Sequence, residues 1–226
     1  MAKISKRMKS AGPLFKKDEI FSLEQAVENV AKFPRVKFDE TVELHLFLNI
    51  NPKSSDQAVR GTVVLPNGLG RDVKVAVFCR GELEKEANDA GADFVGSDDL
   101  IEKVSKGFLG FDVVIAAPDM MRELSKLGKI LGPRGLMPTP KAGTVTADVK
   151  RAVMEVKAGK IEFKSDKQAG LHVGVGKRSF PKEKLLENIK HLIEAIQHAK
   201  PAAVKGNLIK GASLTTTMGP GLRVAL

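Results

Sequence analysis

The stretch LPNGLGRDVKVAVFC, Leu65–Cys79, divides the sequence into two styles of structure. Its first half is a turn-rich connection with a proline and two glycines, and its second half, from Val73, is an apolar strand. From this strand to about Met154, short apolar strands alternate with helices, which is typical of a parallel sheet covered on both faces. The expected elements are VKVAVFC, the helix ELEKEANDA ending at Gly91, ADFV, a helix entered through Asp98, FDVVIAAP, a helix capped by Asp119 and running to about Leu127, and a helix over 147–156.

The residues on either side of this segment follow a different pattern. Ser22-Leu-Glu-Gln25 has the form of a capping box and predicts a helix that Pro34 ends. Residues 41–50 alternate polar and apolar side chains, which predicts a half-buried strand. Further expected elements are GTVVL, GKIEFKS, a polar turn at 166–170, LHVGVGK, a long helix from Ser179-Phe-Pro181 to about Lys200, a strand over 213–217 and a last short strand, GLRVAL.

Charge separates the same pieces. The 226 residues carry a formal net charge of +10. Residues 67–159 hold 14 basic and 14 acidic residues, whereas the two flanks together hold 23 basic and 13 acidic ones. We therefore predict one discontinuous, basic α+β domain from residues 1–66 and 160–226, with an inserted α/β domain at 67–159. Three consecutive small units are the alternative, but the first flank alone would have a thin core.

This basic surplus indicates a polyanionic partner, with nucleic acid as the first candidate and an anionic membrane surface as the second. A soluble basic enzyme is the alternative. No window approaches the ~18 apolar residues of a membrane span, and the basic N-terminus lacks the apolar core of a secretory signal. The single cysteine, Cys79, excludes an intramolecular disulfide and a cysteine zinc site, so we expect a reducing cytoplasm.

Motifs for cofactor chemistry are incomplete. Gly68-Leu-Gly70 precedes its strand instead of following one, and GVGKRS at 174–179 has Arg178 where a phosphate-binding loop needs Ser or Thr. The four histidines do not stand at metal-binding spacing, and no nucleophile elbow is present. We expect no cofactor, no metal and no catalytic site; an enzyme with a nucleotide in the inserted domain is the competing hypothesis.

Two segments favour binding of an anion or of RNA. The Gly- and Pro-rich loop from Lys129 to Gly143 places Arg134 and Lys141 where they could reach a phosphate, although a rigid connection explains it as well. Near the C-terminus, SLTTTMGPG at 213–221 is uncharged and rich in hydroxyls, groups that suit the 2′-hydroxyls and base edges of an RNA minor groove. An ordinary edge strand is the alternative for this segment.

Several motifs together resemble one protein family, the L-one family of bacterial large-subunit ribosomal proteins. They are KFDETVELH (37–45), VRGTVVLPNGLG (59–70), GADFVG, GKILGPRGLMPTPKAGTV (128–145), AGKIEFKSDK and TTTMGP, in order along the whole chain. The resemblance implies an α/β protein of two domains: a discontinuous α+β RNA-binding domain built from both termini, and an inserted Rossmann-like, three-layer α/β/α domain.

The resemblance also implies partners. These are the stalk region of large-subunit ribosomal RNA, exit-site tRNA whose release the stalk assists, and the messenger RNA of the protein's own operon, which free protein represses. It further implies a monomer when free, no membrane, and a cytoplasmic location in the large subunit. A general basic nucleic-acid binder is the remaining alternative, for which duplex DNA should compete as well as structured RNA.

Residues that match the family's RNA contacts fall in three motifs. We expect RNA contacts from Lys37, Phe38, Thr41 and Glu43, from Lys164 and Lys167, and from Thr217, Met218 and Gly219. Phe38 could stack on a base. Because phosphates repel a carboxylate, we expect Glu43 to accept hydrogen bonds from base amino groups or 2′-hydroxyls, or to orient a neighbouring lysine; a solvated strand residue is the alternative.

Overall fold

The computed structural model describes residues 5–12, 19–52 and 54–226. The chain folds into two compact units. One contains the residues up to Gly70 together with Glu162–Leu226, and the other is Arg71–Ile161. The second unit begins and ends a few residues further along the chain than the predicted insert at 67–159.

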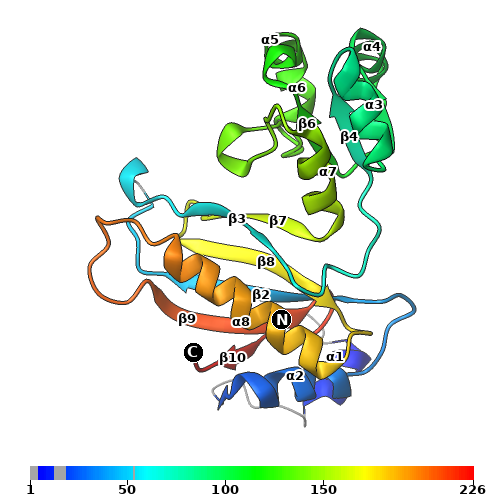
Figure 1. Cartoon of the computed structure of the whole chain (residues 1–226). Coiled ribbons are helices and arrows are strands. Elements are labelled where there is room, and N and C mark those ends of the chain that lie inside the picture. Colours follow the sequence, from blue (N-terminus) through cyan, green and yellow to red (C-terminus); the bar gives the residue numbers. More distant parts are fainter. Residues whose placement is uncertain (1–4, 13–18, 53) are drawn as a thin grey trace. The chain divides into compact units, whose positions relative to one another are not determined.

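The discontinuous unit contains a five-stranded sheet in the order β1-β10-β9-β2-β8 (Figure 1). β1 and β10 are parallel, and the other neighbours are antiparallel. A separate two-stranded sheet pairs β3 with β7. The strands of the unit are β1 (Ile20–Phe21), β2 (Thr41–Leu48), β3 (Arg60–Val64), β7 (Lys160–Lys164), β8 (Gly170–Lys177), β9 (Ile209–Thr216) and β10 (Leu222–Val224), and its helices are α1 (Lys6–Ala11), α2 (Leu23–Lys32), the 3-10 turn η2 (Ser55–Gln57) and α8 (Lys182–His198).

The alternating pattern of β2 decides which face of the sheet is covered. Val42, Leu44, Leu46 and Leu48 are buried, whereas the intervening side chains are half-buried or exposed. Helices α2 and α8 contact each other and the strands, so they cover the apolar face (Figure 1). The other face, which we call the open face, carries the polar residues of β2, and these are half-buried, as the predicted strand requires.

Local sequence signals predict α2 correctly, but they do not predict the elements that precede it. Ser22 and Gln25 form the predicted capping box, and α2 ends just before Phe33. Helix α1 and strand β1 were not predicted, because α1 is six residues long and basic and β1 has two residues. Strand β9 begins at Ile209, four residues before the predicted start, and it lies between β10 and β2. It is an inner strand over 212–214, whereas Thr215 and Thr216 pair with β2 alone, so the edge-strand alternative still describes the threonines.

The inserted unit has a parallel sheet in the order β5-β4-β6. Its connections run from the central strand to one edge through α3 and then across to the other edge through α4. Right-handed crossovers in opposite directions place α3 and α4 on opposite faces, which gives the three-layer α/β/α arrangement. The elements are β4 (Val75–Phe78), α3 (Glu82–Asp89), β5 (Phe94–Gly96), α4 (Asp98–Ser105), β6 (Val113–Ala116), η3 (Pro118–Met120), α5 (Met121–Leu124), η4 (Ser125–Leu127), α6 (Gly128–Leu131), η5 (Pro140–Ala142) and α7 (Val149–Lys157).

The segment after β6 differs from its prediction. Instead of one helix capped by Asp119, a 3-10 turn begins with Pro118 after Ala117, and short α and 3-10 segments follow to Leu131. Proline is favoured in the first turn of a helix, so Asp119 lies inside the turn and does not cap it. The interpretation of 129–143 as one long loop is likewise too simple, since its first residues belong to α6 and it contains η5.

Candidate nucleic-acid interface

The start of β2 and the end of β9 lie side by side and bring together most of the residues expected to contact RNA. Val42 pairs with Thr216 in the antiparallel register. One step further, the backbone N–H of Thr217 donates to the carbonyl of Thr41 at 3.0 Å, and the backbone N–H of Thr41 donates to the Thr217 hydroxyl at 3.0 Å. Two motifs 176 residues apart in sequence thus meet at one end of the sheet, where β2 begins and β9 ends, and we call this surface the β2–β9 edge.

The three threonines of TTTMGP have different roles. The Thr215 hydroxyl faces the carbonyls of Thr216, Gly219 and Pro220 at 3.1 to 3.3 Å and holds the turn. Thr216 is buried, and the hydroxyl of Thr217 already contacts the backbone of Thr41. The expected row of free hydroxyls is therefore reduced to the exposed side chain of Thr217, whose oxygen keeps acceptor capacity for an outside donor.

Beyond Thr217 the surface consists of the apolar Met218 side chain and of the backbone at Gly219. Half of the Met218 side chain is exposed, and Gly219 is half-buried. A Cβ atom on Gly219 would lie 2.3 Å from the hydroxyl oxygen of Thr216, so this turn accepts only glycine without a shift. The turn offers a thioether and an accessible peptide group to a partner.

The residues before β2 extend this surface. Lys37 and Phe38 are exposed, and they line a hollow of about 470 Å³ together with Arg178 and Ser179. Lys177 lies at the same place, because its ammonium group donates to the Thr41 hydroxyl at 3.1 Å. A planar ring beside cations and hydroxyls can stack on a base while the cations contact phosphates.

Glu43 points to the open face of β2, and its titratable neighbour there is His45. Its carboxylate lies 3.6 Å from Nε2 of His45, and the side chain is about one-third exposed. The alternative in which Glu43 orients a lysine is therefore not the arrangement seen, since Lys177 is bonded to Thr41 and to the carbonyl of Asp39.

The structure places Lys164 and Lys167 away from this edge. Gly170 at the start of β8 pairs with Phe47, and Lys177 at its end pairs with Thr41. Lys167 lies in the turn just before Gly170, so the length of β2 separates it from Thr41, roughly 20 Å at ~3.4 Å per residue. Both lysines are exposed.

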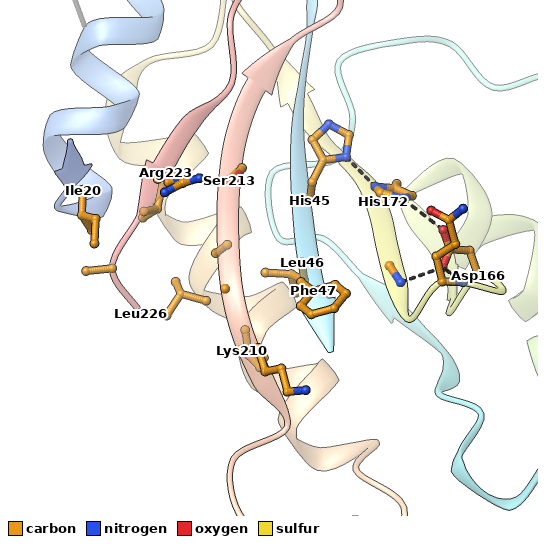
Figure 2. Close-up of a pocket in the computed structure, with 17 residues that line it drawn as sticks. Ile20, His45, Leu46, Phe47, Asp166, His172, Lys210, Ser213, Arg223 and Leu226 are labelled. Carbon is orange, nitrogen blue, oxygen red and sulfur yellow. Dashed lines mark hydrogen bonds and ion pairs between the residues drawn. The ribbon is translucent and has the colours of Figure 1, made fainter. Parts of the chain in front are cut away.

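A second group of titratable side chains lies on the open face of the sheet between these two ends (Figure 2). His45 and His172 approach each other with their Nδ1 atoms 2.7 Å apart, and Asp166 lies 3.6 Å from Nε2 of His172. Burial first and the neighbouring His172 second lower the pKa of His45. Backbone N–H groups of Gly170 and then Gln168 lower the pKa of Asp166, which therefore stays charged beside Lys167.

Residues in the two glycine-rich segments and in the loop 129–143 form hydrogen bonds or ion pairs within the protein. Asn188 is buried and bonds the backbone of Asn67 and Gly68, which fixes the first glycine-rich loop. Arg178 of the second forms a 2.7 Å ion pair with Glu40. In the insert, Arg134 and Lys141 are exposed, and Thr139 and Thr144 bond each other across the base of the connection.

Within the described residues, no group of three or more histidine, cysteine, aspartate and glutamate side chains is arranged to hold a metal ion. None of the helices that the structure describes combines the length and the apolar character needed to cross a bilayer.

Comparison with known proteins decides the family. Residues 28–220 match the ribosomal protein L1p/L10e family. The chain belongs to this family. Relatives named large ribosomal subunit protein uL1 include that of Protochlamydia amoebophila, 52% identical over 226 residues (all of this chain and 96% of the relative). Those of Kosmotoga olearia and Thermosipho africanus are 53% and 55% identical over 224 and 225 residues, in each case 99% of this chain and 97% of the relative.

Membership of the L1p/L10e family makes the chain a ribosomal protein, and its relatives are structural proteins of the ribosome, not enzymes. The competing hypothesis of a nucleotide-dependent enzyme is therefore wrong. In this L1p/L10e protein, Arg7, Lys177 and Arg178 lie at the candidate interface, although the sequence pattern did not predict them there. The pattern around 177–178 indicates only an incomplete phosphate loop, and Arg7 reaches the carbonyl of Met218 from a helix that the sequence does not predict.

Proposed function

We propose that this chain is a structural protein of the large ribosomal subunit and binds its ribosomal RNA through the edge formed by β2 and β9. The discontinuous domain (1–66 and 160–226) carries this interface, and 67–159 is an inserted domain. The observation that carries the proposal is the convergence of Thr41 and Thr217, from two distant motifs, into one exposed edge beside Phe38 and Met218. The assignment to the large subunit, in preference to the small one, comes from the names of the uL1 relatives.

Cationic groups and neutral groups contribute to RNA recognition in different ways. Lys37 and the other cations of the basic domain attract the RNA and make affinity depend on salt. Thr217, Met218 and Gly219 provide a neutral, closely fitting surface for 2′-hydroxyls and base edges, and Phe38 stacks on a base. Thr41 and Glu43 complete this set, whereas Lys164 and Lys167 form a second contact at the far end of β2. Neutral polar groups at short range select the shape of the RNA, which long cations alone would not do.

A titration of stalk-region RNA, labelled on the RNA because the protein has no Trp or Tyr, tests this proposal. Thr217→Val removes the exposed hydroxyl oxygen and should weaken binding by roughly 1–3 kcal/mol at every salt concentration. Thr62→Val is the matched control, since Thr62 is a half-buried strand threonine in β3. Weak binding with a steep salt slope, equal in both variants, would leave only a basic surface and contradict the proposal; equal competition by duplex DNA would do the same.

We also propose, from the family resemblance, that the protein represses translation of its own operon. The same edge would bind a similar structure in the messenger RNA, so the two RNAs must compete. A leader RNA that displaces stalk RNA from the wild-type protein, and loses affinity with Thr217→Val to the same extent, supports this role. Simultaneous binding of both RNAs would contradict it.

Release of deacylated exit-site tRNA is the third part of the proposal, and it too rests on the family resemblance. Ribosomes lacking the protein should release this tRNA more slowly, and wild-type protein added back should restore the rate. Unchanged release would contradict it. The protein would act in the cytoplasm, within the large subunit, and would be a monomer when free.

A further inference from the structure

The carboxylate of Glu40 is buried beneath the edge that contacts RNA in the proposed function. Glu40 is 1% exposed, and among the described residues only Glu40, Asn188 and Thr216 are polar side chains in the buried core. Two of these three, Glu40 and Thr216, contact each other at 3.2 Å. A buried charge is costly unless it is paired, so its place under this turn calls for a reason.

Glu40 connects its surroundings through both carboxylate oxygens. Oε2 accepts from Nη1 of Arg178 at 2.7 Å. Oε1 accepts from the hydroxyl of Thr216 at 3.2 Å and from the backbone N–H of Met218 at 3.1 Å, and it lies 3.8 Å from the guanidinium of Arg7. Oε1 therefore holds the turn on both sides of Thr217.

The partners of Glu40 are themselves fixed. Arg178 also donates to the carbonyls of Ala31, Phe33 and Pro34, at the end of α2. Arg7 donates to the carbonyl of Met218, so the same peptide segment is held from the N-terminal helix as well. The carboxylate thus links the end of α2, the strand entry at 40–41 and the turn at 216–219 into one hydrogen-bonded unit.

We propose that Glu40 is a positioning residue for RNA recognition, which sets the backbone of Thr217, Met218 and Gly219 in the conformation that RNA contacts. Glu40 is too deeply buried to touch RNA itself. Its ion pair alone would not explain its presence, because a buried ion pair contributes little more to stability than apolar side chains of similar size. A carboxylate oxygen aimed at a backbone N–H specifies the geometry of the turn, which an apolar replacement would not.

The test compares RNA titrations of Glu40→Ala with those of Asn188→Ala, well below the unfolding temperature of either. Asn188→Ala removes a buried polar network of the same unit, whose partners are Asn67, Gly68 and Val175. Both variants should lower the melting temperature. We expect Glu40→Ala to weaken RNA binding about tenfold, with the salt slope unchanged because no phosphate contact is lost, and Asn188→Ala to leave affinity within about twofold.

Because the inference rests on the proposed function, the experiment includes Thr217→Val alone and combined with Glu40→Ala. If Glu40 acts through the turn, the two losses are not additive, and Thr217→Val costs less than about twofold once Glu40 is gone. Additive losses, or equal affinities for Glu40→Ala and Asn188→Ala, would overturn the inference while leaving the RNA-binding face in place. No loss with Thr217→Val alone would overturn the proposed function and this inference with it.

Should Glu40→Ala fail to fold, Thr216→Val keeps the inference open to test. This variant keeps the ion pair between Glu40 and Arg178. It removes one of the two hydrogen bonds that join the carboxylate to the turn, that of the Thr216 hydroxyl, while the bond from the Met218 N–H can remain. We expect RNA binding roughly threefold weaker, together with a shifted amide resonance of Met218. Unchanged affinity with an unchanged Met218 amide would contradict the positioning role.

Discussion

At the scale of single residues, the interface contains side chains whose exposure brings no benefit to the folded chain alone. The Phe38 ring is 54% exposed and Met218 is 50% exposed, a few residues from buried strands. Large apolar groups gathered on a polar edge indicate a contact surface, since each would gain free energy by burial against a partner.

Phe38→Ala removes the ring and should weaken RNA binding by about 1–3 kcal/mol per stacked base. Phe38→Tyr keeps an aromatic face and should retain the affinity. Phe108→Ala is the control, because Phe108 is also an exposed phenylalanine but belongs to the insert. The titration of labelled RNA measures all three; an equal loss with Phe108→Ala would argue against stacking at Phe38.

Gly219 and Gly221 form a matched pair in one turn. A methyl group on Gly219 would collide with the Thr216 hydroxyl at 2.3 Å, whereas one on Gly221 meets nothing within 4 Å. Gly219→Ala should therefore cost about 1–3 kcal/mol of stability and also weaken RNA binding, and Gly221→Ala should do neither. Urea unfolding and RNA titration provide the two measurements; indistinguishable variants would contradict the described turn.

At the scale of elements, the alternation of apolar and polar residues in β2 gives the two faces of the strand different roles. Its apolar residues are buried on the face of the sheet that α2 and α8 cover, and its polar residues, from Thr41 to His45, lie on the open face. A shift of one residue in register would exchange the two faces, so the RNA-facing set is held in place by the core on the other side.

The pH dependence of stability should report on His45. Burial lowers its pKa in the folded state, so the unfolded chain binds the proton more readily. Neutral His45 contributes to the free energy of unfolding above its ordinary pKa of 6.5. This contribution is lost as the pH falls below 6.5 and through the lower pKa of the folded state. Urea unfolding at pH 7.5 and 5.5 should show a smaller loss for His45→Gln than for wild type, and an equal loss would contradict this assignment.

The sequence allowed prediction of elements whose signals are local, and it failed where structure depends on distant partners. The capping box of α2 and the alternation of β2 lie within a few residues, and both are confirmed. The roles of Thr216 and Thr217 depend on Glu40 and Thr41, about 176 residues away, so no local pattern could show that their hydroxyls are engaged. For the same reason Glu40 itself was not recognised, although it lies inside the motif KFDETVELH.

At the scale of the whole molecule, charge and structure divide the chain similarly. The segment without net charge corresponds to the parallel α/β unit, and the basic flanks form the unit with the candidate interface. An electrostatic partner is therefore expected to engage the discontinuous unit first.

Cys79 provides a probe of the inserted unit. It is the single cysteine and is fully buried, and burial first, with Glu84 second, raises the pKa of its thiol to about 11. We expect slow thiol labelling at pH 8 that follows unfolding of the insert. RNA should raise the melting temperature of the discontinuous unit and leave the rate of Cys79 labelling unchanged. A labelling rate that falls with RNA would indicate that the insert takes part in binding.

The central claim is that RNA is bound by the edge where β2 begins and β9 ends, and a footprint by amide NMR of the full chain with stalk-region RNA tests it most directly. We predict the largest shifts at residues 37–43 and 215–219, smaller ones around 164–167, and little change at 71–161. Shifts concentrated in the insert, with the amides of Thr41 and Thr217 unmoved, would contradict the account.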